Sequence, residues 1–282
     1  MDDTSYATAG FADRGIEAAL EAIATAGFPQ VEIKGQDPHV AAPPTGRALT
    51  DFRGRLESRG LRARTVHAPA RRVVLGAPDE DWRRDNLVVL ERYIHFAGEI
   101  SATDIVIHPV PSPMFVPNAD DQSVPGRVRD AVGRSLDGLM AASEAAGVRI
   151  NLENLPYDCD YPYLTMRELR PLVDGYPEDR VGLILDIGHV GILRMDPAEE
   201  IHAAGNRLRG THLHDVDFDV PDGDHRVPTH CGLDWDAARL ALSEVSYPGP
   251  WTFEVIMPCH DETPEDMARI TRGVAASWGL CP

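Results

Sequence analysis

Four residues that often bind divalent metal ions each end a short segment with the composition of a β-strand: Glu153, Asp186, His212 and Glu254. Carboxylates that lie close together repel one another unless a cation or a proton lies between them. Three carboxylates and one imidazole form a mainly oxygen donor set, which suits Mn²⁺, Mg²⁺ or Co²⁺ and does not exclude Zn²⁺. We therefore expect these four side chains to bind one divalent metal ion, with Mn²⁺ as the first choice.

Four further histidines are candidate substrate-binding residues, two at the ends of earlier segments and two beyond the expected ligands: His67, His108, His189 and His225. The alternative for each is structural, because a buried histidine often only satisfies backbone groups and a loop histidine often only faces solvent. The direction of His214 stays open, since period-two alternation would put it on the same side as His212 only if the strand continued.

These residues need a scaffold that brings the ends of several strands together. Short apolar segments alternate with longer amphipathic ones along the whole chain, which predicts alternating strands and helices. The predicted strands are residues 5–9, 30–33, 63–67, 104–108, 149–153, 181–186, 208–212 and 251–254. The predicted helices are residues 14–26, 48–59, 81–99, 126–146, 165–173, 197–204, 234–244 and 263–277.

Eight such units predict an α/β fold, a single-domain (β/α)8 TIM barrel that spans residues 1–282. No GxGxxG or GxxxxGK[ST] motif follows a predicted strand, which disfavours a nucleotide-binding doubly wound sheet. Proline and glycine concentrate in the loops 38–46, 109–125 and 221–232. We expect these long loops to form a site at the carboxyl ends of the strands, where barrel enzymes have their active sites.

The charge of the chain limits its partners. Lys and Arg number 27 against 45 Asp and Glu, and the formal net charge is −18, with Lys34 as the one lysine. Nucleic-acid binding needs a basic surface, so we expect no nucleic acid and instead a small, neutral or weakly charged substrate. No apolar segment is long enough to span a membrane, and no secretory signal is evident. The four cysteines form no CxxC pair, which favours a reduced, cytoplasmic protein.

The motifs around the expected ligands resemble those of the xylose isomerase-like barrel superfamily, which includes sugar isomerases and epimerases, inosose dehydratase and endonuclease IV. The likeness covers nearly the whole chain and starts with Ile-Ala-Thr-Ala-Gly-Phe-Pro-Gln-Val-Glu-Ile at residues 23–33. It continues through His-Ala-Pro, Ile-His-Pro, Leu-Glu-Asn, Leu-Asp-Ile-Gly-His, His-Leu-His-Asp and Phe-Glu. The resemblance implies that Glu153, Asp186, His212 and Glu254 are the metal ligands. It also implies that His189 contacts the substrate, as in the epimerases, or an additional metal, as in the endonuclease.

The function that we expect is isomerisation or epimerisation of a sugar, polyol or related hydroxy-carbonyl compound. The metal would hold adjacent hydroxyl and carbonyl oxygens and stabilise a metal-bound enediolate. Glu153 and Glu254 would be the catalytic residues that remove and return a proton at carbon. The same site could instead expel a β-hydroxyl group, as in an inosose dehydratase-like lyase. Two departures argue against a ketose 3-epimerase of the best-known kind, which has Glu where this chain has Cys159 and Arg where it has Phe218.

Two other classes remain open. An endonuclease IV-like zinc phosphodiesterase is supported by the histidines, which have counterparts among that family's trinuclear zinc ligands, but the net charge of −18 disfavours it. A non-catalytic sugar-binding or partner subunit would not need to retain a complete ligand set. Barrel rims often pair, so a homo-oligomer is compatible with the sequence, but no sequence feature decides it.

Overall fold

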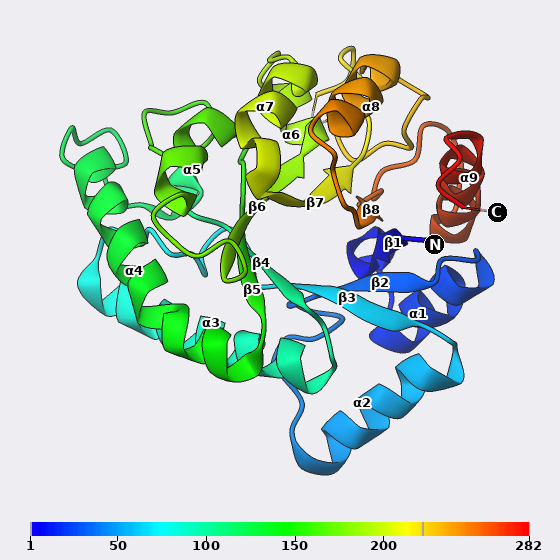
Figure 1. The fold of residues 1–282 in the computed structure, drawn as a ribbon, viewed down its shortest axis with the longest axis horizontal. Helices are drawn as coiled ribbons and strands as arrows, with labels where there is room; N and C mark the ends of the chain where they lie inside the picture. The colour runs from blue at the N-terminus through cyan, green and yellow to red at the C-terminus, as the bar shows by residue number, and fades with distance from the viewer. Residues whose placement is uncertain (1, 222, 282) are drawn as a thin grey trace.

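Eight parallel strands form a closed barrel in the computed structural model of the chain, which describes residues 2–221 and 223–281 (Figure 1). Each strand pairs with the next one along the chain, and β1 pairs with β8 to close the barrel. The strands are β1 (Thr4–Ala7), β2 (Gln30–Lys34), β3 (Arg62–His67), β4 (Asp104–Ile107), β5 (Arg149–Glu153), β6 (Val181–Asp186), β7 (Leu208–Leu213) and β8 (Trp251–Phe253).

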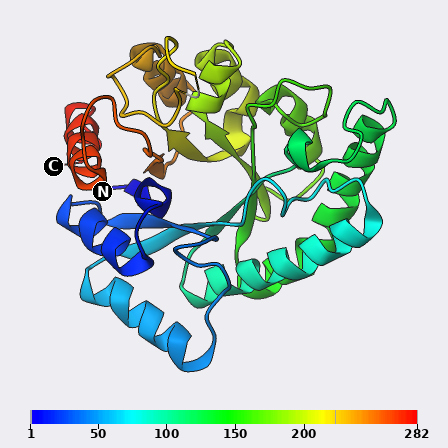
Figure 2. The ribbon, with the colours of Figure 1, turned by 180° about the vertical axis from the view of Figure 1, so that it is seen from behind.

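The α-helices surround the barrel, as Figures 1 and 2 show from opposite sides. They are α1 (Ile16–Thr25), α2 (Gly46–Ser58), α3 (Glu80–Glu99), α4 (Val124–Ala146), α5 (Met166–Val173), α6 (Ile187–Ile192), α7 (Pro197–Ala204), α8 (Trp235–Glu244) and α9 (Pro264–Ser277). Three short 3-10 helices add to these: η1 (Thr8–Phe11), η2 (Pro113–Phe115) and η3 (Gly205–Arg207). Helices outside and side chains inside cover both faces of the strands, which explains the apolar strand sequences.

The predicted single-domain (β/α)8 barrel is therefore confirmed, and the bounds of all the predicted strands and helices lie within two residues of the observed ones. The prediction for residues 5–9 was wrong at its end, because β1 stops at Ala7 and η1 begins. There the Thr8 hydroxyl accepts a hydrogen bond from the backbone N–H of Lys34 at 2.9 Å. Sequence periodicity missed α6, which at six residues is too short to display it.

Helix starts follow local chemistry that the sequence makes visible. Thr165 and Thr263 form capping boxes with the acidic residue three positions later, at the starts of α5 and α9. Aspartate side chains cap α3, α7 and α8 by accepting a hydrogen bond from a backbone N–H of the first turn. These caps define where the loop before each of these five helices ends.

A polar cluster at the amino ends of the strands contains a buried aspartate. Asp104 begins β4 and is 1% exposed. Its carboxylate accepts hydrogen bonds from Arg64 at 2.6 Å, Arg149 at 2.8 Å and Asn151 at 3.0 Å. This carboxylate has its full complement of partners, unlike the carboxylates at the opposite end of the barrel.

The carboxyl ends of the strands lead into the long loops that the sequence predicted. The first two of these loops, residues 38–46 and 109–125, lie after β2 and β4, and 221–232 follows β7 apart from residue 222, which lies outside the described residues. Among the helices of the described residues, none combines the length and apolar character needed to cross a membrane.

The close packing of α3 and α4 gives a test of the fold. An added Cβ at Gly98 would lie 2.7 Å from the carbonyl oxygen of Ala146, whereas one at Gly133 would meet nothing within 4 Å. We predict that Gly98→Ala lowers the free energy of unfolding by about 1–3 kcal/mol because the helices must move apart. The matched variant Gly133→Ala should raise it by about 0.5–1 kcal/mol, since alanine is the better helix former. Urea denaturation measures both, and a Gly98→Ala protein as stable as the parent would contradict the packing.

Candidate metal centre

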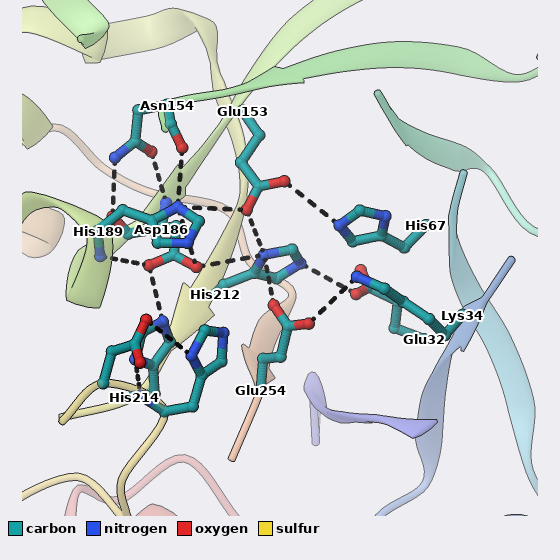
Figure 3. Close-up of polar contacts among 12 residues, drawn as sticks. Glu32, Lys34, His67, Glu153, Asn154, Asp186, His189, His212, His214 and Glu254 are labelled. Atoms are coloured by element: carbon teal, nitrogen blue, oxygen red, sulfur yellow. Dashed lines mark hydrogen bonds and ion pairs between the residues drawn. The ribbon is translucent and has the colours of Figure 1, made fainter. Parts of the chain in front are cut away.

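The four expected metal ligands meet at the carboxyl ends of their strands (Figure 3). Each offers one ligand atom, and these atoms all lie within 4.8 Å of one another. His212 Nδ1 is central: it lies 3.0 Å from Glu153 Oε1, 3.1 Å from Glu254 Oε2 and 3.7 Å from Asp186 Oδ2. All four side chains are buried.

The donor atoms of this cluster fit a bound cation. One ring nitrogen carries at most one proton, yet three carboxylates face His212 Nδ1. Glu153 Oε2 and Asp186 Oδ2 are buried and accept no well-aligned hydrogen bond from the described residues, although His67 Nε2 and His108 Nε2 lie 3.3 and 3.0 Å from Glu153 Oε2. Buried oxygens without partners are costly, and a divalent ion would satisfy them and neutralise the repulsion. The site has an oxygen-rich donor set without a thiolate, which suits hard or borderline divalent ions.

The pKa shifts of His212, Glu153 and Asp186 indicate strong electrostatic interactions between the imidazole and the carboxylates. Burial would lower the pKa of His212, but the surrounding carboxylates, first among them Glu32, hold that pKa well above its usual value. Burial would raise the pKa values of Glu153 and Asp186, but neighbouring histidines more than offset this and hold both well below the usual range. A divalent ion would replace the proton of the imidazole, so metal binding should release protons and weaken at low pH.

Glu32 contacts the second ring nitrogen of His212, and no role for Glu32 was predicted from the sequence. It lies in β2, is fully buried, and its Oε1 is 3.0 Å from His212 Nε2. A carboxylate on one ring nitrogen orients the ring and directs the other nitrogen toward a metal. The signal was present as an acidic residue between Val31 and Ile33, inside a predicted strand.

Asp186 has its two carboxylate oxygens in different roles. Oδ1 accepts the backbone N–H of His189 at 2.7 Å and so caps α6, and it lies 2.8 Å from His214 Nε2. Oδ2 is the oxygen that faces the centre. An added Cβ at Gly188 would lie 1.8 Å from the His214 ring, which explains the glycine in Leu-Asp-Ile-Gly-His. The short helix missed by the sequence analysis thus orients one expected ligand.

His214 and Asn154 are further residues of the site without a predicted role. His214 Nδ1 accepts the backbone N–H of His225 at 2.8 Å, so the proton of a neutral ring is on Nε2, toward Asp186. Asn154 exchanges two hydrogen bonds with the backbone of Asp186, at 2.8 and 3.0 Å. Both residues therefore fix the end of β6. The open direction of His214 is resolved as inward and buried.

The two earlier histidines surround the far oxygen of Glu153. His67 Nε2 lies 3.3 Å and His108 Nε2 3.0 Å from Glu153 Oε2. His67 Nδ1 donates to the carbonyl oxygen of Ala68 at 2.7 Å, which leaves Nε2 to face the carboxylate. Burial lowers the pKa of His108 to about 4, so this ring is neutral at physiological pH.

The two later histidines lie beside Asp186. His189 Nδ1 donates to the carbonyl oxygen of Asn154 at 2.9 Å, so its Nε2 is left for another partner. His225 stacks on His214 with ring centroids 4.0 Å apart, and its carbonyl oxygen accepts the backbone N–H groups of Ile256 and Met257. His225 thus connects the loop after β7 with the segment after β8.

Two additional groups of possible ligands overlap the first. One is Asp186, His189, His214 and His225, and the other is His67, Glu153 and His212. Shared residues mean that these groups are not independent sites. Neighbouring ions could nevertheless share ligands such as Asp186 or Glu153.

A cavity of about 190 Å³ opens onto this cluster. Its lining includes the four candidate substrate-binding histidines, the two glutamates and Lys34. Sites for drug-sized ligands are commonly about 300–1,000 Å³, so this cavity suits a small molecule. Lys34 was not predicted as a site residue, although as the one lysine of the chain it was visible in the sequence.

The cysteines do not contribute to the cavity lining. All four are free thiols and half-buried, and Sγ of Cys231 lies 3.9 Å from Sγ of Cys259. Burial raises the pKa of Cys231 to about 12, with a further contribution from Cys259, which keeps the thiol protonated.

Comparisons with solved structures find the same fold. A D-tagatose 3-epimerase-like protein matches with a TM-score of 0.80 and 19% identity, over 98% of this chain and 96% of that one. The 3-keto-D-glucoside 4-epimerase YcjR of E. coli matches with a TM-score of 0.77 and 20% identity, over 100% of both chains. The zinc-bound IOLI protein matches with a TM-score of 0.79 and 16% identity, over 98% of this chain and 97% of that one.

The family itself is shown by sequence. A family model described as xylose isomerase-like TIM barrel matches residues 20–275, which is most of the chain and includes all four expected metal ligands. The barrel and the sequence match agree, and the chain belongs to the xylose isomerase-like TIM barrel family.

Proposed function

We propose that the protein is a divalent-metal-dependent isomerase or epimerase of a sugar, polyol or related hydroxy-carbonyl compound. The observation that carries the proposal is the convergence of Glu153, Asp186, His212 and Glu254, of which the two glutamates line a small cavity. The sugar epimerases among proteins of similar fold support this substrate class. A cytoplasmic location and a homo-oligomer stay predictions.

The ion would be held by the four clustered side chains, and Mn²⁺ is our first choice, with Mg²⁺, Co²⁺ or Zn²⁺ as alternatives. The zinc of the IOLI protein supports a divalent ion in this fold. When bound, the ion would supply Lewis acidity, which polarises a carbonyl group and stabilises negative charge on oxygen.

Proton transfer at carbon is assigned to Glu153 and Glu254. Both contact the same nitrogen of His212 but approach it from different sides (Figure 3). Both also line the cavity, so a substrate carbon between them could lose a proton to one and gain a proton from the other. Their low pKa values provide ionised bases but weak ones, and a closed, desolvated site would raise their basicity.

The four candidate substrate-binding histidines would bind the oxygens of the substrate. His189 has Nε2 free for this purpose, since Nδ1 is bonded to a backbone carbonyl. His67 and His108 would orient Glu153 as well as line the cavity. His225 would contribute from the loop after β7.

A lyase that expels a β-hydroxyl group after the same proton abstraction is the first alternative. A zinc phosphodiesterase is the second, and the overlapping ligand groups beside the first cluster favour it. The net charge of −18 disfavours a nucleic-acid substrate. A non-catalytic sugar-binding protein would bind the same compounds without exchanging their protons.

Metal binding gives the first test. We predict that the chelator-treated protein binds one Mn²⁺ per chain in calorimetric titration, and that Asp186→Asn weakens this binding at least about 100-fold. A hundredfold excess of free Mn²⁺ over the dissociation constant should stabilise the fold by about 2.7 kcal/mol.

Asp104→Asn is the matched control, because Asp104 is equally buried but lies at the opposite end of the barrel. It should destabilise the fold and leave metal affinity unchanged. Three tightly bound zinc ions per chain would favour the phosphodiesterase over the isomerase. Equal metal affinity in the parent and Asp186→Asn proteins would reject the site.

Solvent deuterium exchange gives the second test. Metal-loaded protein is incubated in D₂O with ketoses, inososes and keto-glycosides, and NMR follows deuterium incorporation at carbon. We predict incorporation into at least one compound, and a rate about 10²- to 10⁴-fold lower for Glu254→Gln at metal saturation, because the variant lacks a proton acceptor.

Glu200→Gln is the control for this substitution. Glu200 is a buried glutamate of α7 whose carboxylate accepts the backbone N–H of Met166. It should change stability but not the exchange rate. Unchanged exchange in Glu254→Gln would remove Glu254 from the mechanism, whereas binding without exchange in the parent would favour the non-catalytic protein.

A further inference from the structure

The one lysine of the chain lies in the candidate active site. Lys34 ends β2, is 8% exposed, and lines the cavity together with Glu254. Its backbone is held firmly: the N–H donates to Thr8 Oγ1 at 2.9 Å, and the next residue is the tightly packed Gly35. An added Cβ at Gly35 would lie 2.7 Å from the ring of Tyr93 and 2.8 Å from the carbonyl oxygen of His67.

Among the described residues, the ammonium group of Lys34 has one weak partner. Nζ lies 3.5 Å from Glu254 Oε1, at the limit of a hydrogen bond, and Glu254 is its one hydrogen-bond acceptor among the described residues. An ammonium has three N–H donors, so at least two are free for other acceptors. Burying a charged group with unused donors is costly, so the arrangement favours a ligand that supplies the acceptors.

The position of Lys34 complements that of the metal cluster. Glu254 turns Oε2 toward His212 Nδ1 and Oε1 toward Lys34 (Figure 3). A molecule bound between the cluster and the cavity wall at β2 would therefore meet the expected metal at one end and the ammonium at the other.

We propose that Lys34 is a substrate-binding residue that recognises an oxygen outside the pair held by the metal. Its ammonium donates a hydrogen bond to a hydroxyl oxygen that lies across the ketone carbon from the hydroxyl held by the metal. The substrates are thereby restricted to polyhydroxy ketones with an oxygen on both sides of the ketone carbon. This inference rests on the proposed function, because it needs a hydroxy ketone at the metal.

A competing role for Lys34 is purely structural. In that case the ammonium only fixes the rotamer of Glu254, and its loss would weaken metal binding and affect all ligands equally. The two roles differ in whether Lys34 distinguishes between ligands that differ by one hydroxyl group.

Two small ketones make this distinction. Dihydroxyacetone and hydroxyacetone both contain an adjacent hydroxyl and carbonyl pair, but only dihydroxyacetone has a second hydroxyl group for Lys34. We expect metal-loaded parent protein to bind dihydroxyacetone about 10-fold more tightly, as for a hydrogen bond to a charged group. Lys34→Met should bind both ketones with the same affinity. Lys34→Arg should recover only part of the difference, since its geometry is different.

A second measurement needs no variant. Incorporation of lysine labelled with ¹⁵N at Nζ gives one side-chain signal per chain, because the sequence contains one lysine. In protein loaded with diamagnetic Zn²⁺ or Mg²⁺, dihydroxyacetone should shift this signal along the same binding curve that calorimetry gives. Hydroxyacetone should shift it much less.

Arg64→Met is the control variant. Arg64 is also a cation paired with a buried carboxylate, that of Asp104, but it lies near the amino end of β3. It should leave the preference between the two ketones unchanged.

The outcomes separate the hypotheses. If dihydroxyacetone binds but the Lys34 signal does not move, or if Lys34→Met keeps the preference, the inference is overturned while the proposed function stands. If neither ketone binds to the metal-loaded protein, the hydroxy-ketone function fails and the inference falls with it.

Discussion

Electrostatic repulsion among buried carboxylates is the constraint that determines the arrangement of side chains at the carboxyl ends of the strands. Glu153, Asp186 and Glu254 direct oxygens at a single nitrogen of His212, with contacts between 3.0 and 3.7 Å. One proton on that nitrogen cannot satisfy three acceptors, so the arrangement requires more positive charge than the imidazole can provide. A divalent ion would supply that charge, and for this reason we propose that the cluster is a metal centre and not a structural ion-pair network.

The fold holds these repelling groups together through contacts just outside the cluster. Glu32 and the closed barrel orient the ring of His212, while the cap of α6 and the side chain of Asn154 fix Asp186. Glu32 contacts one ring nitrogen of His212 and the cap of α6 uses one oxygen of Asp186, so the second nitrogen and the second oxygen face the centre. Stability that comes from burial of the apolar strands and helices elsewhere in the barrel offsets the cost of this preorganised site.

The sequence predicted the barrel because strand and helix periods alternate without interruption, and it predicted the cluster because Glu153, Asp186, His212 and Glu254 end consecutive strands. Glu32 and Lys34 were missed for a different reason. They lie on β2, far from the ligands in sequence, and only closure of the barrel brings them to His212 and Glu254. The spacing of residues along one segment does not reveal which side chains on other strands a residue will contact. The helix α6, which Asp186 caps, escaped prediction because its six residues are too few to show a helical period.

The central claim is that one ion binds between the four converging side chains, and anomalous diffraction tests it most directly. Crystals grown with Mn²⁺ would be measured on both sides of the manganese absorption edge. We expect an anomalous peak at about 2.0–2.3 Å from ligand atoms of Glu153, Asp186, His212 and Glu254. A fully occupied peak elsewhere, or a cluster without a peak while Mn²⁺ is in excess, would contradict it.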